Sequence, residues 1–158
     1  GPRLSILVDT NLLIYASLPA SSEHVVARRW LEDRFADPDS YVGLCWPTLY
    51  AFARLVSNRR LAGEHAVRVA EAWTAADAFR RQRAARMIEG GEVHASIAAE
   101  LMATPGLSSQ DVPDVQLAAL AIEHGLILCS HDRGFARFPG LRFVDPLLVD
   151  PPGDVPSG

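Results

Sequence analysis

Short apolar runs that end in polar or turn-forming residues constrain the fold of this chain more than any other feature. The first run, Leu4–Val8, is rich in β-forming residues and has no polar alternation. Such a run is typical of a strand buried on both faces of a parallel sheet. Further strands are predicted over Tyr41–Cys45, Leu126–Cys129 and Leu141–Val144, with a shorter one near Arg86–Ile88.

Helix-favouring segments separate these runs. Apolar spacing and end signals predict a helix that starts at Leu12–Ala16 and a second over Glu23–Phe35, with Ser22 as its N-cap. A third follows Pro47, with an apolar stripe of Leu49, Phe52, Ala53 and Val56. Two more are expected within Gly63–Met102, on either side of Gly90-Gly91, and a last one runs from Pro113 to Glu123, with Gly125 just beyond its end. The alternation of strands and helices predicts an α/β protein, a three-layer α/β/α sandwich with a central parallel sheet.

Length and composition fit one domain. The chain has 158 residues, of which 49% are hydrophobic and 22% are charged, which is close to the average for soluble globular proteins. We expect a single domain over residues 3–147. Residues 148–158 continue a segment rich in proline that begins at Asp145, and we expect this tail to be disordered. Gly1-Pro2 has the character of a remnant left by a cleaved expression tag.

Several protein classes are not favoured. No apolar run approaches the roughly 18 residues of a membrane span, and no signal segment precedes the first strand. The cysteines, Cys45 and Cys129, lie far apart in apolar runs, so we expect two small core side chains rather than a disulfide framework or a zinc site. We expect a protein of the reducing cytoplasm, without a membrane partner.

The charge balance does not by itself indicate a nucleic-acid partner. The chain carries 15 basic and 19 acidic residues, a net charge of −4. All the basic residues are arginine, whose planar side chain suits bidentate phosphate contacts. A chain without lysine that is rich in alanine also fits a GC-rich coding genome, and we weight that explanation more heavily.

Acidic residues lie where a parallel α/β sheet places its ligands, outside the carboxyl ends of the strands. Asp9 and Asp132 follow two predicted strands, and Asp114 lies in the first turn of the helix that leads into the second of these strands. Three carboxylates brought together repel one another and raise one another's pKa unless a cation compensates them. Ligands that are all oxygen suit Mg²⁺ or Mn²⁺.

Each of these residues also has a purely structural interpretation. An aspartate after a strand or in the first turn of a helix is usually a cap or a partner of the helix dipole. For Asp114 taken alone, the structural interpretation is favoured over a functional one. For Asp9 and for Asp132 taken alone, the two interpretations are equally favoured. The three together, with Asn11 and Ser130 beside them, favour an acidic metal site.

The chain carries an ordered set of motifs: Val8-Asp9-Thr10-Asn11, the segment from Pro113-Asp114 to Ala121, Ser130-His131-Asp132-Arg133-Gly134-Phe135, and the ending Phe135–Arg142 followed by Asp145-Pro146-Leu147. Together they resemble a PIN domain, and more narrowly the VapC-type toxins of bacterial toxin–antitoxin pairs. The resemblance covers Leu4 to Leu147 and implies an α/β/α fold that cleaves RNA with Mg²⁺ or Mn²⁺. It implies that Asp9, Asp114 and Asp132 form the metal pocket, that Ser130 orients it, and that Asn11 supports Asp9.

We therefore expect a metal-dependent endoribonuclease toxin that arrests growth, is a homodimer, and is held inactive by a cognate antitoxin. One departure from the family pattern qualifies this expectation. The family usually has a glutamate in the helix that begins here at Pro47, and the aligned position is Ala51. The loss favours an alternative, a PIN-like module that binds RNA or a partner without catalysis. Asp111 is a possible substitute for the glutamate, although its loop position favours a turn or cap role.

Other residues near the pocket are weighed in the same way. The candidates for an RNA path are Arg54, on the same helix face as Ala51, and Arg59, Arg60, Arg133 and Arg137. For each of them, a solvated or ion-paired side chain is the favoured alternative. His131 is a candidate proton carrier, but a packing role is favoured. Trp30 and Trp73 fit core stripes better than base-stacking platforms.

A third interpretation is a phosphotransfer or hydrolase domain with Asp9 as nucleophile. A haloacid-dehalogenase pattern requires a second aspartate at position 11, where this chain has Asn11. A receiver-like pattern requires a late lysine, and the chain has none.

Overall fold

The computed structural model describes residues 5–148 and has the predicted three-layer architecture. The described strands are β1 (Ile6–Val8), β2 (Val42–Leu44), β3 (Ala85–Met87), β4 (Ile127–Cys129) and β5 (Phe143–Val144). They form one sheet in the order β3-β2-β1-β4-β5, and every neighbouring pair is parallel. The prediction of a central parallel sheet is therefore confirmed.

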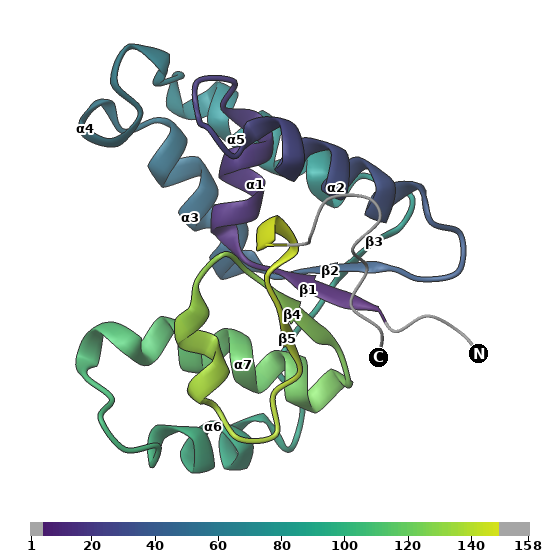
Figure 1. Ribbon diagram of the computed structural model, residues 1–158, viewed down its shortest axis with the longest axis vertical. Coiled ribbons are helices and arrows are strands. Elements are labelled where there is room, and N and C mark those ends of the chain that lie inside the picture. Colours follow the sequence, from purple (N-terminus) through teal and green to yellow (C-terminus); the bar gives the residue numbers. More distant parts are fainter. Residues whose placement is uncertain (1–4, 149–158) are drawn as a thin grey trace.

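Helices cover both faces of this sheet (Figure 1). One face carries α1 (Thr10–Ser17), α2 (His24–Ala36), α3 (Trp46–Val56) and α5 (Val69–Arg80), and the other carries α6 (His94–Met102) and α7 (Val112–His124). Short elements complete the described chain: α4 (Arg59–Ala62) and the 3₁₀ turns Gly63–His65, Ser109–Asp111, Arg133–Arg137 and Pro146–Leu148. None of the helices within residues 5–148 is long and apolar enough to cross a membrane.

The sheet separates two hydrophobic cores, because successive side chains of a strand point to opposite faces. Ile6 and Val8 pack in the core under α1, α2, α3 and α5, whereas Leu7 between them packs in the core under α6 and α7. In that second core α7 contributes mostly small side chains, among them Ala118, Ala119 and Ala121, all fully buried. Cys45 and Cys129 are both free and buried, as predicted.

Gly43 in the middle of β2 permits close packing on the α7 side of the sheet. A Cβ atom at this position would lie 2.8 Å from the backbone oxygen of Ile6, 2.9 Å from Cγ1 of Ile88 and 3.3 Å from Cδ1 of Leu126. The first of these contacts is with backbone, which cannot move aside without disturbing the β1–β2 pairing. A side chain at this position is therefore incompatible with the present spacing.

Most predicted element boundaries are confirmed within a few residues, but two helices begin slightly off the predicted residue and one predicted cap is wrong. The first helix begins at Thr10, before the predicted Leu12, because Asp9 acts as its N-cap. The second begins at His24, and Glu23 is its N-cap with no side-chain cap bond, so the predicted N-cap role of Ser22 is wrong. Gly125 does end α7, in the left-handed conformation at φ 66°.

The final described segment lies against the fold. Pro146–Leu148 form a 3₁₀ turn, and Leu147 packs against the core beneath α2. The predicted disorder of the tail beyond Leu148, the predicted tag remnant Gly1-Pro2 and the start of the first run at Leu4 all lie outside the described residues.

Replacing Gly43 with alanine should destabilise the fold by about 1–3 kcal/mol, because the added methyl overpacks a site bounded by backbone. Urea denaturation measures this change. As a control, Ser22→Ala removes an exposed hydroxyl with no cap bond and should stay within about 0.5 kcal/mol of wild type. A Gly43→Ala protein as stable as the wild type would show that β2 accommodates the methyl group.

Candidate functional site

The candidate site begins where β1 and β4 end side by side. The two strands pair in register, with Val8 opposite Cys129, so the residues that follow them, Asp9 and Ser130, meet at one edge of the sheet. The Ser130 hydroxyl donates a 2.7 Å hydrogen bond to Oδ2 of Asp9. The two strand ends therefore bring Asp9 and Ser130 into direct contact.

Ser130 is completely buried and makes as many hydrogen bonds as a hydroxyl can. Besides donating to Asp9, its oxygen accepts from Nδ2 of Asn11 at 3.2 Å and from the backbone N–H of Asp132 at 3.0 Å. Oδ1 of Asn11 in turn accepts from the backbone N–H of His131 at 3.4 Å. Ser130 and Asn11 therefore fix the position of Asp9 relative to the turn that carries Asp132.

Asp9 combines a capping role with a place in this network. Its Oδ1 accepts from the backbone N–H of Thr10 at 2.7 Å and caps α1. Burial raises the pKa of the Asp9 carboxyl above its ordinary value; the hydrogen bonds from Ser130 and Thr10 act in the opposite direction, and the nearby charge of Asp132 adds to the rise. The structural and functional interpretations of Asp9 are thus compatible.

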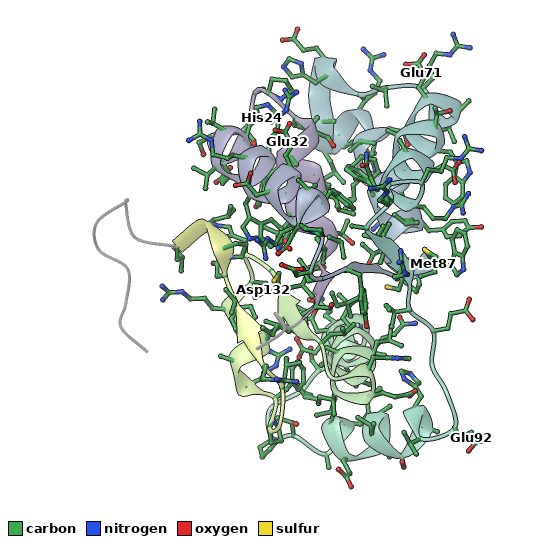
Figure 2. All side chains as sticks on the ribbon, turned by 90° about the vertical axis from the view of Figure 1, so that its right-hand side faces the viewer. His24, Glu32, Glu71, Met87, Glu92 and Asp132 are labelled. Atoms are coloured by element: carbon green, nitrogen blue, oxygen red, sulfur yellow. The ribbon has the colours of Figure 1, made fainter. Side chains whose placement is uncertain are left out.

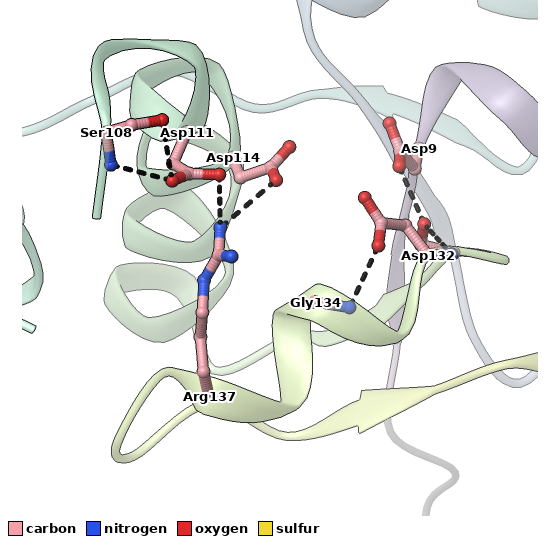
Figure 3. Close-up of polar contacts among 8 residues, drawn as sticks. Asp9, Ser108, Asp111, Asp114, Asp132, Gly134 and Arg137 are labelled. Atoms are coloured by element: carbon pink, nitrogen blue, oxygen red, sulfur yellow. Dashed lines mark hydrogen bonds and ion pairs between the residues drawn. The ribbon is translucent and has the colours of Figure 1, made fainter. Parts of the chain in front are cut away.

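Asp132 and Asp114 complete the acidic group from two further segments. Asp132 caps the Arg133–Arg137 turn by accepting from the backbone N–H of Gly134 at 2.8 Å. Asp114 lies in the first turn of α7. In the view of Figure 3 it lies between Asp111 on one side and the pair of Asp9 and Asp132 on the other. Burial first, and then the charges of Asp132 and Asp9, raise the pKa of Asp114 to about 6.

Arg137 reaches Asp114 from the turn after β4 (Figure 3). Its Nη2 donates to Oδ1 of Asp111 at 3.0 Å and to Oδ2 of Asp114 at 3.4 Å. Asp111 itself accepts from the backbone N–H and the hydroxyl of Ser108 in a capping box, so its predicted cap role is confirmed. The ion-paired interpretation also holds for Arg137, whose positive charge moderates the pKa of Asp114.

The three carboxylates share one region without forming a ready chelate. Within residues 5–148 no three His, Cys, Asp or Glu side chains are grouped closely enough to hold one metal ion directly. The direct contacts among the predicted site residues are those of Ser130 with Asp9, Asn11 and the backbone of Asp132. The three carboxylates affect one another only through charge: Asp132 acts on Asp9, and both act on Asp114. The donor set is nevertheless all oxygen and mutually repulsive, which is the chemistry that Mg²⁺ compensates in proteins.

His131 has a packing role beside the site. Its Nδ1 lies 2.8 Å from Oδ2 of Asp145, and its ring meets Tyr15 edge-on at a centroid distance of 5.8 Å. Asp145 was not among the residues predicted for the site, because it begins the proline-rich segment that leads into the tail. Asp145 directly follows β5, so the strand-end rule that found Asp9 and Asp132 also applies to it.

The position of the missing glutamate lies on the helix next to α1. Ala51 is half-buried, one turn after Thr48 on α3. The hydroxyl of Thr10, the residue after Asp9, lies 3.5 Å from the backbone oxygen of Thr48. Because residues three apart share a helix face, Ala51 lies on the side of α3 that approaches the start of α1.

Comparison with known proteins identifies the family. Residues 6–141 match the sequence model of the PIN domain. The chain belongs to the PIN-domain family. This PIN domain is 38% identical over 142 residues to Ribonuclease VapC43 of Mycobacterium tuberculosis, and the match covers 90% of the chain and 95% of that relative. The resemblance to VapC proteins inferred from the sequence motifs is thus confirmed.

Solved structures share the PIN fold with this chain. One is VapBC2 from Rickettsia felis bound to a DNA fragment from its promoter, with a TM-score of 0.66 and 18% identity over 89% of this chain and 98% of that chain. Another is a toxin–antitoxin complex from Klebsiella pneumoniae, with a TM-score of 0.56 and 22% identity over 90% of this chain and 98% of that chain. At these identities the likeness concerns the fold.

The raised pKa of Asp114 predicts that its charge destabilises the metal-free protein. The pKa of Asp114 is about 6 in the folded protein, above the ordinary value of 3.8. The folded protein therefore has its full stability from this group below about pH 4, where Asp114 is protonated, and loses it as the pH rises through about 6. Asp114→Asn should therefore be more stable than wild type at pH 7, on the order of 1 kcal/mol after solvent screening, and this gain should vanish near pH 4. Urea denaturation without divalent ions at both pH values measures it.

Asp111→Asn is the matched control for this prediction. The hydrogen bond from the Ser108 backbone and the charge of Arg137 lower the pKa of Asp111, so neutralising it should destabilise the protein at pH 7, in the opposite direction. An Asp114→Asn protein that is less stable than wild type at pH 7 would show that Arg137 outweighs burial and the neighbouring carboxylates.

Proposed function

We propose that this PIN domain is an endoribonuclease that cleaves RNA phosphodiester bonds with Mg²⁺ or Mn²⁺. The observation that carries the proposal is the convergence of Asp9, Asp114 and Asp132, whose charges are felt at one another in a partly buried region. The relationship to proteins named as VapC ribonucleases supports an RNA substrate. It also disfavours the alternative of a non-catalytic PIN-like module.

The proposed metal ligands are Asp9, Asp114 and Asp132. Mg²⁺ usually retains several waters and takes only one or two protein carboxylates directly, so a loosely grouped set of this kind fits the ion partly through water. When bound, a divalent cation supplies a water of lowered pKa and stabilises charge on the scissile phosphate.

The residues of the chain prepare this site in distinct ways. The hydroxyl of Ser130 holds one oxygen of Asp9, and the backbone of Thr10 holds the other, so that the carboxylate is fixed before a ligand arrives. Asn11 fixes Ser130 from the other side. Arg137 donates to Asp114, and this hydrogen bond would have to open for Asp114 to hold a metal ion.

Partners follow from the same relationship. We propose that a cognate antitoxin binds this chain and suppresses its activity, that the free protein arrests growth, and that it works as a cytoplasmic homodimer. The shared fold with a chain of a toxin–antitoxin complex supports the antitoxin partner. Expression with and without the neighbouring gene product, followed by growth measurement and co-purification, tests the partner and the growth arrest together.

Neutralising the acidic group should abolish cleavage. Asp9→Asn and Asp114→Asn should each lower the rate of RNA cleavage by more than about 100-fold, since even changes in residues behind metal ligands remove 10–100-fold. Purified, antitoxin-free protein is incubated with total RNA with and without Mg²⁺ or Mn²⁺, and the cuts are mapped. Asp33→Asn, which changes an exposed aspartate of α2, is the control that should retain activity. Wild-type rates in either site variant would overturn the assignment.

Restoring the family glutamate should strengthen metal use. Ala51→Glu adds a carboxylate on the side of α3 that approaches Thr10 and Asp9, so it should lower the Mg²⁺ concentration needed for half-maximal cleavage. Ala51→Gln, of equal size but neutral, is the matched control and should leave that concentration unchanged. If the new carboxylate only pairs with Arg54, the two variants will give the same midpoint in a metal titration.

A further inference from the structure

A hollow of about 230 Å³ lies along the same edge of the sheet as the acidic group. It is bounded by the start of α3, the loop after β3, the start of α6 and one face of α7, through Trp46, Pro47, Glu89, Gly90, His94 and Gln116 among others. These elements follow β2 and β3, whereas the acidic group follows β1 and β4. Figure 2 shows Met87, at the end of β3, and Asp132, after β4, both in the central layer between the two layers of helices.

The hollow adjoins the acidic group through shared elements. Cys45, which directly follows β2, lines the hollow, and its Sγ lies 3.2 Å from the hydroxyl of Thr48. The backbone oxygen of Thr48 in turn accepts from the hydroxyl of Thr10, the residue after Asp9, at 3.5 Å. Helix α7 carries Asp114 on its first turn and contributes Gln116 to the hollow. We expect an RNA strand that follows this edge of the sheet from Asp9 to reach the hollow.

The lining suits a nucleobase better than a phosphate. No arginine is among the described residues that line the hollow, and Glu89 is an acidic residue there, whose carboxylate repels a phosphate. Trp46 provides an aromatic surface that is 38% exposed. Its ring is held in place by Trp73, which stacks on it at a centroid distance of 6.5 Å and an interplanar angle of 16°. Unpaired RNA bases stack on such rings and form hydrogen bonds along their edges.

The wall opposite Trp46 is fixed rather than loose. Gly90 lies so close to His94 that an added Cβ would be 2.8 Å from its ring. The carboxylate of Glu123 accepts from the backbone N–H of Gly91, and Nε2 of His124 lies 2.8 Å from the backbone oxygen of Glu89. The loop after β3 is thus tied to the end of α7, which restricts the movement of this wall of the hollow.

We propose that this hollow holds one base of the single-stranded RNA substrate, next to the scissile phosphate, and selects bases that carry an amino group. The inference rests on the proposed ribonuclease function. The base stacks on Trp46, its amino group donates to the carboxylate of Glu89, and Gln116 offers a second hydrogen bond at the base edge. Uracil has no amino group, so it leaves the Glu89 carboxylate without this donor.

The cleavage experiment uses a short single-stranded oligoribonucleotide that contains a mapped cut site. Each position near the cut is replaced in turn by an abasic residue. Wild type should lose about tenfold in kcat/KM at one position, the magnitude of one base–aromatic stack. Trp46→Ala should lose about the same factor on the intact substrate and become insensitive to that abasic replacement, whereas Trp46→Phe should remain close to wild type. Thermal unfolding of each variant confirms that it is folded.

Tyr50→Ala is the matched control. The Tyr50 side chain is 63% exposed and its ring centroid lies 4.9 Å from that of Trp73, but Tyr50 does not line the hollow. It should behave as wild type towards every substrate. Glu89→Gln should reduce the preference for an amino-bearing base over uracil at the sensitive position. Cleavage that responds to none of these changes, or to Tyr50→Ala as much as to Trp46→Ala, overturns the base site.

A binding experiment separates failure of this inference from failure of the proposed function. Oligoadenylate, oligocytidylate and oligouridylate are titrated against Asp9→Asn protein, with and without Trp46→Ala or Glu89→Gln. If the base site exists, oligouridylate binds Asp9→Asn more weakly than oligoadenylate and oligocytidylate do. This difference should disappear when Asp9→Asn is combined with Trp46→Ala or Glu89→Gln. If wild type cuts no RNA while this pattern holds, the nuclease proposal alone fails; if the three oligonucleotides bind alike, the base site is overturned.

Discussion

The hydroxyl of Ser130 joins the parts of the molecule on which the candidate site depends. It is fully buried, and it links Asp9 after β1, Asn11 on α1 and the backbone of Asp132 after β4. A hydroxyl has one donor and two acceptor positions, and all three are used here. Since buried polar groups are costly when left without partners, a single side chain fixes the relative positions of two segments, 9–11 and 130–132, that are far apart in sequence.

The network explains how acidic residues can be both structural and chemical. Asp9 caps α1 and Asp132 caps the turn after β4, so each carboxylate already has backbone partners. Asp114 instead lies near three like charges, those of Asp132, Asp9 and Asp111, and one arginine. The site therefore contains two carboxylates whose positions are fixed by local hydrogen bonds and one whose charge is poorly compensated. Strongly perturbed ionisable groups of this kind are a feature of functional sites.

Much of the fold and of the site followed from the sequence, for local reasons. Continuous apolar runs predicted strands β1, β2, β4 and β5, and the strand-end rule placed Asp9, Ser130 and Asp132 at one edge of the sheet. The errors concern features that depend on neighbours. Ser22 has the chemistry of a cap, but the turn before α2 leaves Glu23 at that position. The contacts of Arg137 with Asp114 and of His131 with Asp145 join segments whose relative placement no local pattern encodes.

The alanine-rich face of α7 has a further consequence. Asp114 belongs to the helix layer above one core, whereas Asp9 belongs to the sheet and caps a helix on the opposite side. The separation between these two carboxylates is therefore set by how closely α7 approaches the strands, which the small side chains of Ala118, Ala119 and Ala121 determine. Packing in the interior thus sets the distances within the acidic group. A methyl group added beneath α7 changes the geometry offered to a cation without altering any of the residues that would bind it.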